Sequence, residues 1–160
     1  MGGDFNDFIY TITVEGSQIY VGGDFLNAAS IAEADRIVVY DIHDDDPTWK
    51  PIGGGLNGPV MAIKIVGSDV YVGGDFTDAG GIPGADNIAR WDGRKWNALG
   101  DGLSDMVYDM EIVGTDVYAV GRFEDAGGIP GADAIARWDG SAWHALEPGL
   151  SSGTIITIAS

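Results

Sequence analysis

The sequence repeats itself every 47 residues, and this period limits the possible folds more than any other feature. Residues 60–106 and 107–153 are identical at 30 of 47 positions without a gap. The first repeat is more divergent and gains four residues in the acidic stretch 43–46. Large side chains mark the period: Trp49, Trp96 and Trp143, and Leu56, Leu103 and Leu150. A repeat of this length indicates one supersecondary unit stacked several times.

Each repeat contains four strand signals and no helix signal. In the second repeat, strands are predicted over 60–66, 69–75, 87–92 and 96–99. Along the first of these, the apolar residues Met61, Ile63 and Ile65 alternate with their neighbours, as in a strand with two different faces. Gly67-Ser68 forms a hairpin turn to the second strand, and Asp92-Gly93 turns the third strand into the fourth. The predicted fold class is therefore all-β.

A period of 40–50 residues with four strands per unit is typical of a β-propeller blade. We predict a single repeat domain, 1–160, with three blades at about 9–52, 60–99 and 107–146. The alternating segment 154–160 is predicted to be an extra strand, the first of a further blade. Residues 2–5, GGDF, are interpreted as the end of a second strand whose blade is otherwise missing.

The repeat also resembles a known family. A double glycine follows an apolar strand, and paired tryptophans come after it: Gly22-Gly23, Gly73-Gly74, Trp91 with Trp96, and Trp138 with Trp143. This arrangement resembles kelch-like or galactose-oxidase-type propeller repeats. The wording IARWDG-x-x-W is similar to repeats of large bacterial secreted and surface proteins. The resemblance implies an extracellular or bacterial cell-surface location.

Face-to-face packing of blades gives the recurrent residues a structural role. A glycine in a strand lets another backbone approach closely, and we expect this of Gly22, Gly23, Gly73 and Gly74. The tryptophans are expected to fill the wider gap near the rim, where blades splay apart. Trp96 and Trp143 should therefore be largely buried, with Trp49 as their counterpart in the first blade.

The charge of the chain excludes one class of partner. Asp and Glu outnumber Lys and Arg 25 to 8, which gives a formal net charge of −17. Such a chain repels phosphate backbones, so we expect no nucleic-acid partner. The apolar segments, such as the one around 60–66, are far too short to cross a membrane. No membrane span is therefore predicted.

No motif predicts catalysis, a cofactor or a metal. Residues 53–58 match G-x-G-x-x-G, but a strand follows where a dinucleotide site needs a helix. The aspartates form no run of the calcium-loop type. His43 and His144 lie in different repeats, and the absence of cysteine excludes the cysteine-linked copper chemistry of galactose oxidase. We therefore predict a protein that is not an enzyme.

Three blades cannot close a ring, because propellers need at least four. An open stack exposes apolar blade faces, which attract partners. We predict an interaction or structural scaffold that self-associates or forms part of a larger propeller, a two-fold ring of six blades being the simplest closure. The self-association residues are expected to be Thr154, Ile155, Ile156, Ile158, Tyr10 and Ile12. A lectin-like carbohydrate binder that uses Trp91 and Trp138 is the alternative.

Overall fold

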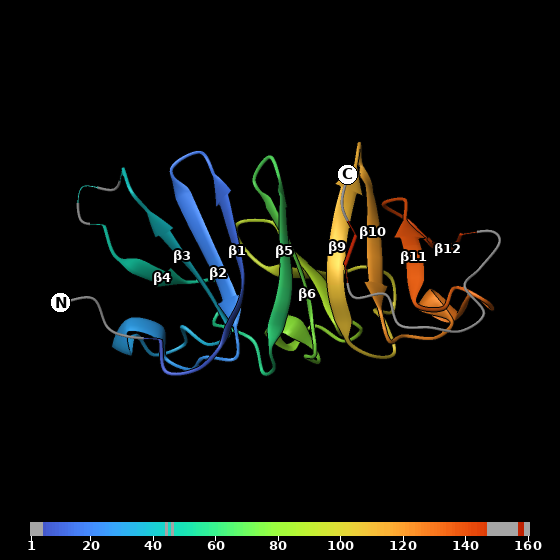
Figure 1. The fold of residues 1–160 in the computed structure, drawn as a ribbon, viewed down its shortest axis with the longest axis horizontal. Helices are drawn as coiled ribbons and strands as arrows, with labels where there is room; N and C mark the ends of the chain where they lie inside the picture. Colours follow the sequence, from blue (N-terminus) through green and yellow to red (C-terminus); the bar gives the residue numbers. More distant parts are fainter. Residues whose placement is uncertain (1–4, 44, 46, 147–156, 159–160) are drawn as a thin grey trace.

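The computed structural model describes residues 5–43, 45, 47–146 and 157–158. Within these residues the chain forms three antiparallel four-stranded sheets, which stand side by side along the long axis (Figure 1). In every sheet the strands follow one another in chain order, so each repeat builds one complete blade. The fold is all-β, as the sequence predicts.

The twelve strands have closely matching lengths in the three blades. Blade 1 contains β1 (Ile9–Glu15), β2 (Gln18–Gly23), β3 (Ile37–Asp41) and β4 (Trp49–Pro51). Blade 2 contains β5 (Val60–Val66), β6 (Asp69–Gly74), β7 (Ile88–Trp91) and β8 (Trp96–Ala98). Blade 3 contains β9 (Val107–Val113), β10 (Asp116–Gly121), β11 (Ile135–Trp138) and β12 (Trp143–Ala145).

A short 3₁₀ turn follows the second strand of each blade: η1 (Ala28–Ser30), η2 (Ala79–Gly81) and η3 (Ala126–Gly128). Asp78, just before η2, and Gly80 within it take left-handed backbone angles, with φ of 47° and 60°, a conformation that glycine adopts without strain. The Asp86 carboxylate accepts a hydrogen bond from the Asp78 N–H at 2.7 Å and closes this loop. In the described part of the chain, no helix has the length and apolar character needed to span a membrane.

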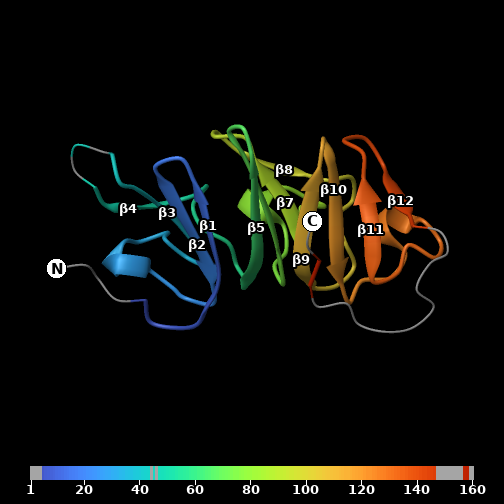
Figure 2. The same ribbon diagram turned by 45° about the horizontal axis from the view of Figure 1, so that its top comes forward.

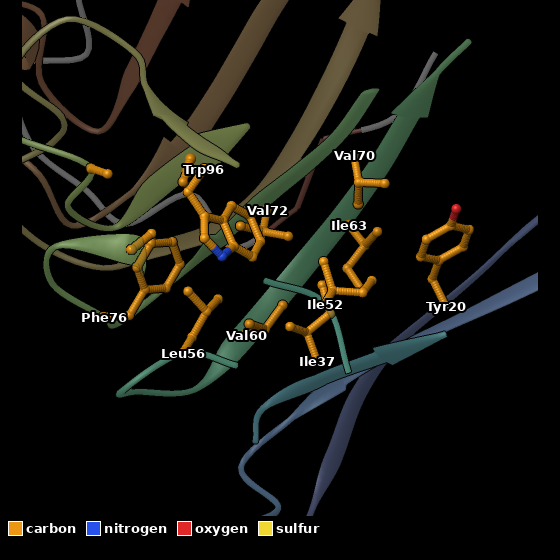
Figure 3. Packing of buried hydrophobic residues seen from close by; sticks show 13 residues of the cluster. Tyr20, Ile37, Ile52, Leu56, Val60, Ile63, Val70, Val72, Phe76 and Trp96 are labelled. Carbon is orange, nitrogen blue, oxygen red and sulfur yellow. The ribbon is translucent and has the colours of Figure 1, made fainter. Parts of the chain in front are cut away.

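The first strands of the blades lie next to one another, with β5 between β1 and β9 (Figures 1 and 2). We call the face of a blade that is turned to the preceding blade its front face, and the opposite one its back face. Between blades 1 and 2, the back face supplies Tyr20, Ile37, Ile52 and Leu56, and the front face supplies Val60, Ile63, Val70, Val72 and Phe76 (Figure 3). The apolar core therefore lies largely between the blades.

The structure corrects the interpretation of residues 2–5, of which Phe5 is described. Asn6 Oδ1 accepts a hydrogen bond from the Leu26 N–H at 2.9 Å. The same contact recurs between Asn57 and Thr77 and between Ser104 and Glu124. Asn6 is thus the equivalent of residues in the linkers that lead into blades 2 and 3. Phe5 belongs to the linker into blade 1 and not to the end of a second strand.

Candidate interaction surfaces

On the front face of blade 1, Ile9, Ile12 and Val14 of β1 form an open apolar surface, whereas Val21 of β2 and Val38 of β3 are buried. All three side chains of β1 are exposed, Ile12 to 61%. Phe8, just before the strand, is still more exposed. Apolar side chains gathered on one strand face in this way mark an interaction site more often than scattered ones do.

The positions of Ile9 and Ile12 are buried in the other two blades, and that of Val14 is partly buried. The strand pairings make Ile12 of β1 equivalent to Ile63 of β5 and Met110 of β9. Ile63 is 2% exposed and Met110 is 0% exposed, because the back face of the preceding blade covers each of them. The front face of blade 1 is therefore a blade-packing surface whose covering blade is not among the three.

Two glycines determine how closely a back face approaches the next blade. A Cβ atom on Gly22 would stand 2.6 Å from Val60 Cγ1, and one on Gly73 would stand 2.6 Å from Val107 Cγ1. Carbon atoms in ordinary contact are about 3.5–4.0 Å apart, so any side chain here would push the blades apart. Gly22 and Gly73 therefore have the packing role that the sequence suggests.

Gly23 and Gly74 have a different role from the one expected. A Cβ on Gly23 would collide with the Phe8 carbonyl oxygen, and one on Gly74 with the Pro59 carbonyl oxygen, both within the same blade. The register between the first two strands shifts at this point, as in a β-bulge, and the bulge brings the two backbones together. These glycines permit the bulge and do not face a neighbouring blade.

The tryptophans differ between the blades. Trp96 and Trp143 are buried, and the Trp143 indole N–H donates a hydrogen bond to the Leu99 carbonyl of blade 2 at 2.8 Å. The indole nitrogen of Trp96 has no hydrogen-bond partner among the described residues. Trp49 is half-buried and packs edge-on against Phe5, with ring centroids 5.3 Å apart. Its position on the open front side of blade 1 accounts for its greater exposure.

The predicted self-association residues are only partly within the described structure. Thr154, Ile155 and Ile156 lie outside the described residues. The Thr157 hydroxyl and the Ile158 N–H both donate to Asp109 Oδ2 of β9, each at 2.9 Å. Tyr10 and Ile12 are exposed on β1, in blade 1. The structure thus places Ile158 and Ile12 on different end blades of the stack, so a contact between them would require a second molecule.

A cavity of about 350 Å³ lies between blades 1 and 2. Its lining combines the aromatic rings of Tyr20 and Trp91 with the polar side chains of Glu15 and Gln18. The Tyr20 hydroxyl donates to Gln18 Oε1 at 2.6 Å. Burial, followed by the negative charges of Asp41 and Glu15, raises the pKa of Tyr20, so its hydroxyl remains a neutral donor.

Aspartates in the turns between third and fourth strands hold the backbone. Asp92 Oδ1 accepts hydrogen bonds from the N–H groups of Arg94 and Lys95 at 2.9 and 3.0 Å, and Asn97 donates to Oδ2 at 3.0 Å. The backbone bond from Lys95, then those from Asn97 and Arg94, lower the pKa of Asp92 to about 2. This carboxylate is therefore a structural acceptor.

The equivalent turn of blade 3 contains His144. Asp139 accepts bonds from Ala142 and Ser141, and its Oδ2 lies 2.6 Å from His144 Nε2. These contacts, with the Ala142 N–H first, lower the pKa of Asp139. His144 therefore occupies the place of Asn97 in the same turn. No group of three or more potential metal-binding side chains gathers in the described ranges.

The comparisons with known proteins agree with the architecture. The family model of the Rax2 C-terminal beta propeller domain matches residues 2–159. A search of curated proteins returned no significant match. The family match covers all three blades and the linkers between them.

Proposed function

Because the chain belongs to the family of Rax2 C-terminal β-propeller domains, we propose that it is a non-enzymatic propeller module that acts as a structural and interaction scaffold. One observation carries the proposal. Ile12 is 61% exposed at a position where both other blades bury the equivalent side chain. A surface shaped for blade packing but left open is a binding surface.

The binding force would come from burial of apolar side chains. Covering Ile9, Ile12 and Val14 removes hydrocarbon from water, which is favourable in proportion to the area buried. Two sources of a covering blade fit this function: other copies of the chain, or the rest of a larger propeller. Both would extend the stack by the kind of contact seen between blades 1 and 2.

The polar residues support a role without catalysis. The carboxylates of Asp92 and Asp139 are occupied by turn hydrogen bonds, and His144 contacts Asp139. We also propose that the repeats are kelch-like, on the basis of the glycine and tryptophan pattern. An extracellular or bacterial surface location is proposed from the similarity of IARWDG-x-x-W to repeats of such proteins.

The Ile12→Asp variant of the full chain tests the scaffold proposal. Ile12 is exposed, so the substitution should leave the fold intact while it places a charge in the binding surface. The wild-type chain should self-associate in sedimentation velocity or bind a fluorescent apolar dye, and I12D should lose that property. Ile129→Asp, the same change at an exposed isoleucine of blade 3, is the control. Equal association and dye binding by wild type and I12D would contradict the proposal.

Carbohydrate binding is the second candidate, and the cavity lined by Tyr20, Trp91, Glu15 and Gln18 favours it. Aromatic rings can stack on sugar faces, while carboxylate and amide groups bond sugar hydroxyls. A glycan array with the wild-type chain and with Glu15→Gln tests it. A glycan signal that E15Q loses would support this candidate, and no signal from the wild-type chain would exclude it for the glycans on the array.

A further inference from the structure

The two end faces of the blade stack, the front face of blade 1 and the back face of blade 3, are not complementary in the way that the internal faces are. At both internal contacts, the back face carries a glycine where the next first strand crosses it. Gly22 faces Val60 and Ile63, and Gly73 faces Val107 and Met110. The bare backbone is part of the contact geometry, because no Cβ fits at either position.

The third back face lacks this glycine. Val120 of β10 pairs with Asp109 and Ile135, in the register in which Gly73 pairs with Ala62 and Ile88. The back face of blade 3 therefore carries a branched side chain, itself 0% exposed in this chain, where blades 1 and 2 carry none. The sequence shows the same exchange, with YAVG in the third repeat in place of YVGG.

A second copy that stacked head to tail would first have to uncover this buried valine, which would then meet the front face of blade 1. The residue opposite Val120 would then be Ile9, the equivalent of Val60 and Val107. Ile9 is larger than valine by one methylene group, so both sides of the contact are larger than in the internal contacts. Excess volume in a packed contact forces the backbones apart.

The back face of blade 3 differs at a second position. Asp109 stands where blades 1 and 2 have Thr11 and Ala62. Its carboxylate holds Thr157 and Ile158 of the same chain through two hydrogen bonds of 2.9 Å. These two residues therefore contact the face of blade 3 against which, at the internal contacts, the first strand of the next blade packs. The back face of blade 3 therefore differs from the other two in its residues and is already in contact with Thr157 and Ile158.

We propose that the front face of blade 1 takes a blade with a glycine on its second strand opposite Ile9 and Ile12, and that blade 3 of a second copy does not fit it. The partner is thus a further propeller blade of the YVGG type. This inference rests on the proposed scaffold function. Of the two sources of a covering blade, it favours the rest of a larger propeller over another copy of the chain.

The test changes the back face of blade 3 so that it resembles the back face of blade 2. The substitutions D109A and V120G give blade 3 the residues of blade 2 at these two positions; Tyr118 and Ile135 already match Tyr71 and Ile88, and Glu111 remains in place of Lys64. Adding I12D closes the variant's own front face, so that D109A/V120G/I12D can only donate a blade. Mixed with the wild-type chain, it should form a one-to-one complex in sedimentation velocity.

Three controls define the contact. The I12D chain with native Val120 should bind the wild-type chain roughly 10- to 100-fold more weakly than the triple variant does. An I129D acceptor should bind the triple variant as the wild-type chain does, whereas an I12D acceptor should not bind it. Circular dichroism and a cooperative thermal transition confirm that each variant is folded. V120G/I12D replaces the triple variant if that chain fails to fold.

Two outcomes would overturn the inference. If I12D with native Val120 binds the wild-type chain as tightly as the triple variant, the glycine is not required, while the scaffold proposal stands. If a folded triple variant does not bind the wild-type chain, the glycine-bearing blade is not the partner. Unchanged dye binding by I12D in the same experiments would remove the scaffold proposal as well.

Discussion

At the residue scale, the two adjacent glycines of each YVGG segment have different structural roles. Gly73 faces the next blade, where a Cβ would press on Val107, whereas Gly74 faces the backbone of Pro59 in its own blade. The first glycine sets the spacing between blades, and the second permits the bulge within a blade. The loss of stability from a substitution at the first glycine should therefore be relieved by a smaller residue in the next blade, whereas a loss at the second glycine should not.

Gly73→Ala should destabilise the chain by about 1–3 kcal/mol, because the new methyl group overpacks the contact with Val107. Adding Val107→Ala should make the double variant more stable than the sum of the two single effects predicts, since the opposing Cγ1 is removed. Chemical denaturation of the four chains measures this coupling. Strict additivity would contradict a direct contact between the two positions.

The two buried tryptophans should differ when each is replaced by phenylalanine. Trp143→Phe removes the hydrogen bond to the Leu99 carbonyl, whereas the Trp96 indole nitrogen has no partner in the described structure to lose. The Trp143→Phe variant should lose about 1 kcal/mol more stability than Trp96→Phe. Urea midpoints compare them, and a larger loss for Trp96→Phe would contradict the assignment.

Some of these residue roles could be predicted from the sequence. The recurrence of Gly73 and Trp96 suggests blade packing, and the structure shows both at the blade contact. The role of Gly74 could not be foreseen, because it depends on a bulge that periodicity does not reveal. Val120 was visible as YAVG in place of YVGG, but its meaning required the register that sets it on the back face.

At the scale of elements, the turn between third and fourth strands is closed by a single aspartate. Asp92 accepts two backbone N–H groups of the turn and the amide of Asn97 on β8. The ionised carboxylate accepts all three bonds through its two oxygens, and protonation weakens them because it removes the charge and occupies one oxygen. The turn therefore depends on pH.

The pKa of Asp92 is about 2 in the folded chain, below its ordinary value of 3.8. A group with a lowered folded pKa stabilises the fold above its unfolded pKa, and that stabilisation is lost as the pH falls through the folded pKa. Stability should therefore fall between about pH 4 and pH 2, less so in Asp92→Asn. Urea midpoints across this range measure the effect. Equal pH dependence in both chains would contradict the role of Asp92.

The boundaries of the elements show where sequence patterns stop being informative. The third strand of blade 2 is predicted over 87–92 but forms over Ile88–Trp91. Asn87 has a φ of 60°, which a strand does not allow, and its side chain donates to the Leu103 carbonyl at 2.8 Å. That contact joins residues 16 apart in the chain, so no local pattern predicts it.

At the scale of the whole molecule, the two ends of the blade stack are different. On the front face of blade 1 the first strand is open and apolar, whereas the back face of blade 3 carries the buried Val120 and the Asp109 contact with Thr157 and Ile158. The repeat count predicts an open stack, but identical repeats would have made both ends complementary. The departures in the third repeat make them different, and they favour a partner other than a second copy.

Salt should strengthen the binding of D109A/V120G/I12D to the wild-type chain. The wild-type chain has a formal charge of −17, so association brings like charges together, and added salt screens their repulsion. The internal contact between β5 and β9 contains the ion pair Lys64–Glu111. At the intermolecular contact, Glu111 of the donor would take the place of Lys64, and Thr13 of the acceptor would take the place of Glu111.

No ion pair would therefore replace the one between Lys64 and Glu111, and burial of Ile9 and Ile12 would supply the attraction. Between about 0.01 and 1 M salt the screening length falls from about 30 to about 3 Å. The association constant from sedimentation should rise over this range. A fall with added salt would mean that ion pairs dominate the contact and that the blades do not meet in the geometry of the internal contacts.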